Sequence, residues 1–412
     1  MAPDLDAHFQ RYDGFEPMVP VWSVTAGLHR FFDTSPISPS GRFLSVTRLP
    51  FEDRLPKPGE EADVVLVDLE TGEESVVAVT RGWDTQLGAQ AQWGADDTQL
   101  FFNDLDTRTW APFGVKLNPL TGERAELEGT VYMVSRDGGW AASPCLLRTA
   151  LTQAGYGVIV PPDYIPANQG AAADDGLFVT DVATGCRRLL VSLREIAERA
   201  EPPLGPAQFE RGTLYGFHVK WTPAGDRLML VVRSVPDDGS RMRSNVVTMR
   251  ADGSDIRVAM HADVWGRGGH HPDWHPDGEH VTMNLKLDGE TMRLVQVRYD
   301  GTGLRSLSDA VVGSGHPSLH PDGRHVVADA YPGESVAFGD GTTPIRLIDL
   351  ETGDDHCLVR IRTAPDYSGP RNELRVDPHP AWDRECRRIA FNACPDGTRR
   401  VYIADLSEFL EG

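Results

Sequence analysis

The sequence predicts an all-β, seven-bladed β-propeller that takes in residues 1–412 as one domain. Two phrases recur along the chain, each of them seven times, and the composition agrees with them. The chain holds 41 glycines and 30 prolines among its 412 residues, which suits many short strands joined by tight turns better than long helices.

The first recurring phrase is an apolar run, a turn rich in Pro, Asp and Gly, and a second apolar run. Its copies read SPISPSGRFLSV, AQWGADDTQLFF, YMVSRDGGWAAS, VKWTPAGDRLMLVV, PDWHPDGEHVTM, PSLHPDGRHVVA and PAWDRECRRIAF. Gly and Asp tolerate the positive φ angles of tight turns. Each copy therefore predicts the two inner strands of a blade.

The second recurring phrase predicts a further strand, because its apolar residues alternate as in Val65, Val67 and Leu69. Its copies read VVLVDLETGEE, GVKLNPLTGER, LFVTDVATGCR, VVTMRADGSDIR, LVQVRYDGTGLR, IRLIDLETGDD and VYIADL. Three or four strands repeated seven times are typical of propeller blades. Only residues 190–200 have a helical pattern, and Val19–Val24 are expected to close the last blade as an outer strand.

One column of the repeat is rich in histidine. The apolar anchors of the inner strands are Ile37, Trp93, Val134, Trp221, Trp274, Leu319 and Trp382. Three residues before the last four anchors stand His218, His271, His316 and His379, and the earlier repeats have Thr34, Gln90 and Val131 there. Equivalent positions of adjacent blades converge on one mouth of a propeller channel. The column therefore predicts a divalent metal site, since imidazole nitrogens are standard ligands of such ions.

Two other interpretations of this column remain open. The histidines could bond to neighbouring loop backbones, or act as catalytic imidazoles without a metal. Two neighbours belong to the same region: His270 stands in the glycine-rich phrase GRGGHHP, and Asp377, two residues before His379, is a candidate ligand or a partner that orients a ring nitrogen.

The net charge, the N-terminal sequence and the cysteine content narrow the expected partners and the expected compartment. The formal net charge is −21, which argues against nucleic acid or an anionic membrane as the main partner. We see no signal peptide in MAPDLDAHFQRYDG and no bilayer-spanning segment. The five cysteines form no CxxC pair, so we expect reduced cysteines in a cytoplasmic protein.

The C-terminal half resembles oligogalacturonate lyases. The similarity rests on GGHHPDWHPDGEH, GSGHPSLHPDG and the ending VDPHPAWDRECRRIAFNACPDGTRRVYIADLSE, and it covers about the last 200 residues. It implies that His271 is the catalytic base and that His316 and His379 are ligands of a manganese-type site. Asp377 occupies the place of the first histidine in the family's HPHP phrase.

The first half is more similar to propeller lyases that act on ulvan and on rhamnose-glucuronate chains, and it shares its repeats with TolB-like propellers. The sites of those lyases pair a tyrosine with an arginine sixteen residues later, the spacing of Tyr132 and Arg148. Those lyases also use early-blade histidines, where this chain offers Gln86, Gln90 and Gln92, with His29 as the only early histidine candidate.

These resemblances imply a carbon–oxygen lyase that cleaves uronate-containing oligosaccharides, of oligogalacturonate or glucuronate type, by β-elimination. A divalent ion (Mn, Zn or Ca) with Arg148 or Arg243 would neutralise the carboxylate, and His271 would take the proton. Tyr132 would protonate the leaving oxygen or serve as the base. The alternatives are a non-catalytic TolB- or WD-like binding propeller with a structural metal, and a metal-dependent hydrolase or lactonase.

Overall fold

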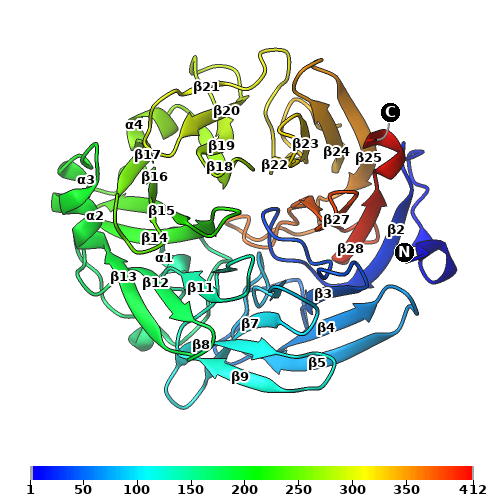
Figure 1. Cartoon of the computed structure of the whole chain (residues 1–412), viewed down its shortest axis with the longest axis horizontal. Helices are drawn as coiled ribbons and strands as arrows, with labels where there is room; N and C mark the ends of the chain where they lie inside the picture. The colour runs from blue at the N-terminus through cyan, green and yellow to red at the C-terminus, as the bar shows by residue number, and fades with distance from the viewer. Residues whose placement is uncertain (1–2, 411–412) are drawn as a thin grey trace.

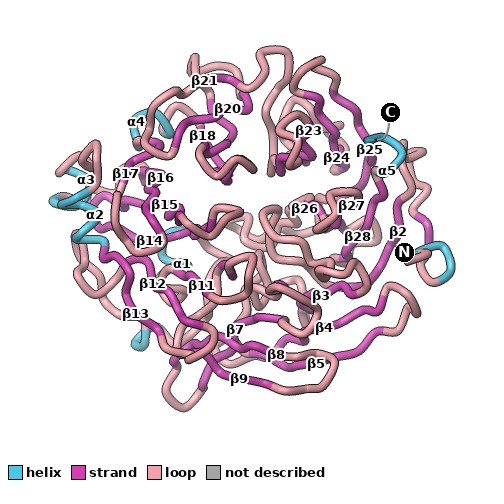
Figure 2. Tube along the Cα trace, viewed as in Figure 1, coloured by secondary structure: helices cyan, strands magenta, loops and turns pink. Residues whose placement is uncertain are grey.

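The structure, a computed structural model, describes residues 3–410 and contains seven sheets around one central axis (Figure 1). This confirms the seven-bladed propeller predicted from the repeats. Within a blade the chain runs outward, so that β5, β9 and β13 lie at the rim of the ring in Figure 1. Figure 2 shows that strands and loops make up nearly all of the ring.

Every blade is an antiparallel sheet, and in the first six the strands follow one another in sequence. Blades one to four consist of β3 (Phe43–Arg48), β4 (Ala62–Asp68) and β5 (Glu74–Thr80); β6 (Gln92–Trp93), β7 (Leu100–Asp106), β8 (Ala111–Leu117) and β9 (Arg124–Leu127); β10 (Met133–Val134), β11 (Trp140–Ser143), β12 (Gly176–Asp181) and β13 (Arg187–Ser192); β14 (Gly212–Trp221), β15 (Arg227–Pro236), β16 (Arg243–Arg250) and β17 (Arg257–Met260). Blades five to seven consist of β18 (Gly269–Trp274), β19 (His280–Leu285), β20 (Arg293–Arg298) and β21 (Arg305–Ser306); β22 (Ser318–Leu319), β23 (His325–Ala328), β24 (Thr342–Asp349) and β25 (Asp355–Arg362); β26 (Ala381–Trp382), β27 (Arg388–Ala393), β28 (Arg400–Asp405), β2 (Val21–Ala26) and β1 (Gln10–Arg11).

The ring closes through the last sheet, which combines both ends of the chain. Strand β2 pairs with β28, with Trp22 opposite Ile403, and β1 continues the sheet outward. This arrangement covers the edge of β28, which would otherwise present unpaired backbone groups.

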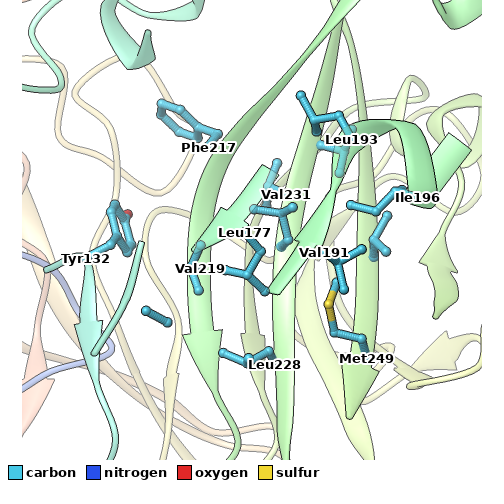
Figure 3. Close-up of a cluster of buried hydrophobic side chains, with 14 of the residues drawn as sticks. Tyr132, Leu177, Val191, Leu193, Ile196, Phe217, Val219, Leu228, Val231 and Met249 are labelled. Carbon is cyan, nitrogen blue, oxygen red and sulfur yellow. The ribbon is translucent and has the colours of Figure 1, made fainter. Parts of the chain in front are cut away.

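The helices are short and lie between strands: η1 (Leu5–Ala7), α1 (Thr149–Thr152), η2 (Pro162–Tyr164), α2 (Leu193–Arg199), α3 (Ala207–Glu210), α4 (Ala262–Trp265) and α5 (Ser407–Leu410). Helix α2 falls within the segment with a helical pattern, and a capping box of Ser192 and Glu195 starts it. Its Leu193 and Ile196 join the apolar core of the third and fourth blades (Figure 3). No helix within residues 3–410 is long and apolar enough to span a bilayer.

Tryptophans on the inner strands tie the second, fifth and seventh blades to the blades before them. The indole nitrogen of Trp93 donates to the carbonyl of Pro36 at 2.8 Å, and that of Trp382 donates to Ser318 at 3.1 Å. Trp274 makes the same bond to Lys220 at 3.1 Å. This explains why the anchor column is rich in tryptophan, since the side chain fills the core and also bonds across the blade boundary.

Buried asparagines on the second strands hold chain segments at or near the histidine column. Asn284 donates to the carbonyl of Gly315 at 2.9 Å, and Asn103 bonds both backbone groups of Val131. Asn392 does the same for His29 across the ring closure. The column residues of successive blades are therefore fixed by side chains of the blade before.

A plug from the N-terminal segment fills the centre of the ring, where Figure 1 shows the dark-blue stretch after β2 turning inward. Phe31 and Phe32 are about 2% and 1% exposed. Lys220 lies 4.1 Å from the centroid of Phe32, and its Nζ is 3.1 Å from a carboxylate oxygen of Asp33. Asp33 also pairs with Arg30 at 2.6 Å. The plug separates two mouths of the channel, and the anchor column lines a cavity of about 360 Å³ at one of them.

Candidate active site

The four column histidines meet around Phe31 at the other mouth of the channel. The centroid of the Phe31 ring lies 5.0 Å from His218, 6.2 Å from His271, 5.7 Å from His316 and 4.6 Å from His379. His316 also lies 3.8 Å from His271 and 4.3 Å from His379. The structure thus brings all four histidines together, with Phe31 stacked on His218 and three rings in direct contact.

The backbone leaves the regular strand geometry at this column. His271 and His379 have φ angles of 55° and 52°, and Gln90 in the second blade has 62°. In the sixth blade Gly315, just before His316, takes a φ of 49°. Left-handed conformations are unfavourable for residues with a side chain and concentrate at functional sites, so this column is held in place by its surroundings.

Three side chains here could hold a metal ion. Ligand atoms of His316, Asp377 and His379 all lie within 4.8 Å of one another, and the three side chains are buried. Both ring nitrogens of His379 are buried without a hydrogen-bond partner. Burial of two unsatisfied ring nitrogens is costly in an apolar surrounding. A metal bond would satisfy one of them, so the residues present fit a divalent ion.

A carboxylate orients one of these ligands. Nδ1 of His316 donates to Asp329 Oδ2 at 2.9 Å, which leaves Nε2 as the nitrogen with a free lone pair. Gly315 permits this approach, because a Cβ there would lie 2.2 Å from an oxygen of Asp329. Metal-binding histidines commonly donate their other nitrogen to a carboxylate in this way.

His271 is arranged as a neutral base. Its Nδ1 donates to the carbonyl of Gly315 at 2.6 Å, so its Nε2 is unprotonated, 3.2 Å from the Tyr331 hydroxyl. Burial, together with His316 and His270, holds the pKa of His271 well below 6.5. The same cause lowers the pKa of His270 to about 4. An imidazole that stays neutral can accept a proton from a substrate near pH 7.

His218 pairs with the predicted catalytic tyrosine. The hydroxyl of Tyr132 hydrogen-bonds Nδ1 of His218, and burial raises the pKa of Tyr132 well above 10, so the phenol stays protonated. A hydroxyl that donates to Nδ1 leaves the imidazole proton on Nε2. Tyr132 is about 1% exposed, whereas His218 lines the adjacent cavity.

That cavity has a volume of about 590 Å³ and receives side chains from the fourth, fifth and sixth blades, from the loop between β11 and β12, and from the connection between β25 and β26. It is lined by His218, His270 and His271, by Tyr156 and Tyr331, by Arg233, Arg241, Arg243 and Arg375, by Gln153 and Asp263, and by neighbouring apolar and small residues. The cavity is therefore rich in cations and hydroxyls although the chain as a whole is strongly acidic. An anionic small molecule fits such a local field better than a neutral one.

Arg233, on β15, is the unusual cation in this cavity. Its guanidinium donates to Thr152 at 3.1 Å and to Gln153 at 2.7 Å, lies 3.2 Å from the centroid of Phe217, and has a buried Nε without a partner. Within residues 3–410, no ion pair joins Arg233 to a carboxylate. Burial lowers its pKa from 12.5 to about 9. A half-buried guanidinium without a counter-ion is prepared for an external anion.

The other arginine at the floor of the cavity is already paired. Arg375 bonds Asp377 at 2.8 Å and the Tyr156 hydroxyl at 2.9 Å. Because it occupies one oxygen of Asp377, it also fixes the orientation of that carboxylate beside His379. Arg375 therefore positions a ligand side chain, whereas Arg233 has no carboxylate partner among residues 3–410.

The two arginines proposed from sequence occupy different places. Arg148 does not line the cavity: it pairs with Asp175 at 2.7 Å and donates to the carbonyls of Pro166 and Ala167, all within the long loop inserted between β11 and β12. Sequence spacing after Tyr132 does not decide which way the side chain points, and the insertion supplies its partners. Arg243 lines the cavity at the rim, where it pairs with the exposed Asp263.

Replacement of Arg148 by methionine is expected to destabilise the protein by about 3–5 kcal/mol, because it leaves a buried carboxylate without its cation. Burial already raises the pKa of Asp175. Chemical denaturation measures the effect, and the double variant Arg148→Met, Asp175→Leu should recover much of it. A variant of unchanged stability that has lost activity would instead place Arg148 in the catalytic machinery.

The glutamines of the early blades form hydrogen bonds with the backbone around the site and with the plug. Gln86 donates to the carbonyl of Glu373 at 2.9 Å, Gln92 bonds the third-blade segment around Tyr132, and Gln90 accepts from Arg30 at 3.0 Å. His29 lies 6.3 Å from His379, buried, with both ring nitrogens unpartnered. These glutamines hold the plug and the chain segments that surround the site.

Comparison with known proteins supports the fold. No family model matches the chain, and no curated protein matches it in sequence. A solved oligogalacturonate lyase in complex with manganese is 15% identical, with a TM-score of 0.65 over 98% of this chain and 97% of that chain. An oligogalacturonate lyase from Vibrio parahaemolyticus is also 15% identical, with a TM-score of 0.64 over the same shares. The β-propeller domain of the Trilobed protease from Pyrococcus furiosus is 10% identical, with a TM-score of 0.50 over 92% of this chain and 95% of that chain. At such identities the likeness shows a shared fold alone.

Proposed function

We propose that this protein is a metal-assisted lyase that cleaves uronate-containing oligosaccharides by β-elimination. The observation that carries the proposal is the joint presence, in one cavity, of an arginine without a counter-ion and a neutral imidazole with a free nitrogen. The three buried ligand-type residues beside them support it. Elimination needs these elements because the proton next to the carboxylate becomes acidic only when that carboxylate is neutralised.

Arg233 is the residue that would receive the uronate carboxylate. Thr152 and Gln153 fix the guanidinium plane while Phe217 supports one face, and no carboxylate within residues 3–410 pairs with it. A charge-assisted bond in this half-buried place is stronger than one at the surface. It also discriminates against neutral sugars, which would leave the guanidinium unpaired.

His271 would take the proton from C5 of the uronate. The Gly315 carbonyl holds its Nδ1–H, so the accepting lone pair is on Nε2, next to the Tyr331 hydroxyl. When the substrate binds, Tyr331 gives up this contact and the substrate hydrogen takes its place. The low pKa of His271 keeps the base unprotonated across the neutral range.

His218 would deliver the proton that the leaving O4 oxygen requires. Its Nε2–H is available because Tyr132 donates to Nδ1. Tyr132 would keep its proton, because burial raises the pKa of its phenol well above 10, and its role would be to hold His218 in this tautomer and orientation.

A divalent ion would be held by His316, Asp377 and His379, and when bound it would supply a Lewis acid for the uronate carboxylate. Asp329 and Arg375 orient two of these ligands. The solved oligogalacturonate lyase in complex with manganese has the same fold, and this supports the choice of manganese for the first reconstitution.

The test is incubation of the manganese-loaded protein with oligomers of galacturonate, ulvan and rhamnose-glucuronate. We expect at least one of them to give an unsaturated product, followed by the ultraviolet absorbance of its conjugated double bond. The His271→Ala variant should lose about a hundred- to ten-thousand-fold in kcat, the usual contribution of a general base. A protein that binds these sugars and never forms the unsaturated product would be a binding propeller.

A further inference from the structure

A second group of metal-type side chains lies on the turn that joins β22 to β23. The turn reads His320-Pro321-Asp322-Gly323-Arg324-His325, and ligand atoms of His320, Asp322 and His325 lie within 4.8 Å of one another. Pro321 lines the cavity at the mouth opposite the candidate active site. The group therefore belongs to a different part of the molecule.

The distances within this group suit a metal ion. Asp322 Oδ2 lies 3.0 Å from His320 Nδ1 and 2.7 Å from His325 Nδ1. Bonds of about 2.0–2.2 Å to nitrogen and oxygen, at the angles of tetrahedral or octahedral sites, place ligand atoms roughly 3 Å apart. Small rotations of the three side chains would suffice to surround an ion.

Two of these atoms face each other without a proton between them. The backbone amide of Asp322 donates to Nδ1 of His320 at 3.2 Å, so this nitrogen is an acceptor and carries no proton. The carboxylate oxygen beside it is an acceptor too. A cation would turn this repulsion into attraction, and the turn does not need the long amide contact, because Gly323 donates to the carbonyl of His320 at 3.0 Å.

The group is supported from one side and open on the other. The ring of His320 lies edge-on to Trp382 at 5.1 Å, and a Cβ at Gly323 would lie 3.8 Å from the ring of His275 in the preceding blade. The side chains of His320 and His325 keep 18% and 19% of their surface exposed. An ion from solution can therefore reach them.

We propose that the β22–β23 turn binds one divalent transition-metal ion through His320, Asp322 and His325. Two imidazoles and one carboxylate favour zinc, nickel or copper over magnesium and calcium, which prefer oxygen ligands. This site is independent of the proposed lyase function, because it shares no residue with the candidate active site.

The fifth blade provides a matched comparison. Its turn, His275 to His280, repeats the same residue types, and Asp277 lies 3.1 Å and 2.8 Å from its two histidines. Within residues 3–410, however, this turn does not bring its three ligand atoms within 4.8 Å of one another. Variants of this turn therefore show the effect of removing a histidine from an equivalent turn that is not expected to bind the ion.

The experiment is a nickel titration of the whole chain by calorimetry, with tryptophan fluorescence as a second readout, because a paramagnetic ion beside His320 should quench Trp382. We expect His325→Ala and His320→Asn to lose one nickel equivalent and the associated quenching, and His280→Ala to retain both. His320→Asn keeps a side-chain acceptor for the Asp322 amide, so the turn can still form, and circular dichroism checks this. The His379→Ala variant distinguishes nickel bound at the candidate active site from nickel bound at the β22–β23 turn.

Unchanged nickel stoichiometry in His325→Ala and His320→Asn would overturn the proposal. Loss of the equivalent in His280→Ala instead would also overturn it, by moving the site to the fifth blade. Neither result would bear on the lyase reaction, which is measured separately with uronate oligomers.

Discussion

Replacement of Arg233 by methionine is expected to lower kcat/KM for a uronate oligosaccharide by about two to three orders of magnitude. Loss of a charge-assisted partner in a half-buried place costs roughly 3–5 kcal/mol, and each 1.4 kcal/mol corresponds to about a factor of ten. Methionine keeps an unbranched stem in place of that of arginine, so the variant removes the guanidinium together with its contact to the Phe217 ring. Steady-state kinetics with the best substrate of the panel measures the effect.

The stability of this variant gives an independent check. Burial without a counter-ion lowers the pKa of Arg233 to about 9, so the folded protein disfavours the charge that the unfolded chain carries freely. Below about pH 9 this cost is present in full, and it is relieved only as the pH rises from there towards 12. Arg233→Met should therefore unfold at the same temperature as the wild type or a higher one at neutral pH.

Arg243→Met is the matched control, because Arg243 lies at the rim of the same cavity and pairs with an exposed aspartate. Exposed ion pairs contribute about 0–1 kcal/mol, so we expect less than roughly a tenfold change in kcat/KM. Equal losses in the two variants would contradict the assignment of Arg233 as the carboxylate-binding residue.

Replacement of His379 by alanine is expected to weaken manganese binding at the candidate active site by at least about a hundredfold. Loss of a residue that merely orients a ligand typically costs about 10–100-fold in metal affinity, and loss of the ligand itself should cost more. Metal content after dialysis and calorimetric titration measure the change. Activity should fall with occupancy, and chelation of the wild-type protein should have the same effect, reversed by added manganese.

Asp329→Asn tests the same centre through the residue that orients His316. The hydrogen bond from His316 Nδ1 to an amide oxygen is weaker than the bond to a carboxylate. Manganese affinity should therefore fall by about 10–100-fold, less than in His379→Ala. An unchanged affinity in both variants would show that His316, Asp377 and His379 do not form a metal site.

The blades could be predicted from sequence because each strand and turn of a propeller is specified locally. The phrases with Pro, Asp and Gly turns correspond to hairpins such as β18–β19 and β26–β27. The histidine column was visible for the same reason, since repeated register places His271 and His379 equivalently in their blades. The structure adds Phe31, which no repeat predicts, as the ring on which the column converges.

The residues that sequence analysis missed depend on contacts between distant segments. Arg233 stands in the apolar run LMLVVRSV, and a charge within a buried strand was the available signal. Asp329 ends the apolar run of β23 in a similar way, but only the folded sheet brings it to His316. Arg148 had the expected spacing from Tyr132, yet the inserted loop turns it towards Asp175.

The most direct test of the proposed reaction is the fate of solvent oxygen during cleavage. The reaction is run in water labelled with heavy oxygen, and the products are analysed by mass spectrometry. β-Elimination forms the double bond without adding water, so the new non-reducing end should be unsaturated and should carry no label from the cleavage step. Incorporation of one labelled oxygen in a saturated product would identify a hydrolase and would contradict the assignment of His271 as the base that takes the C5 proton.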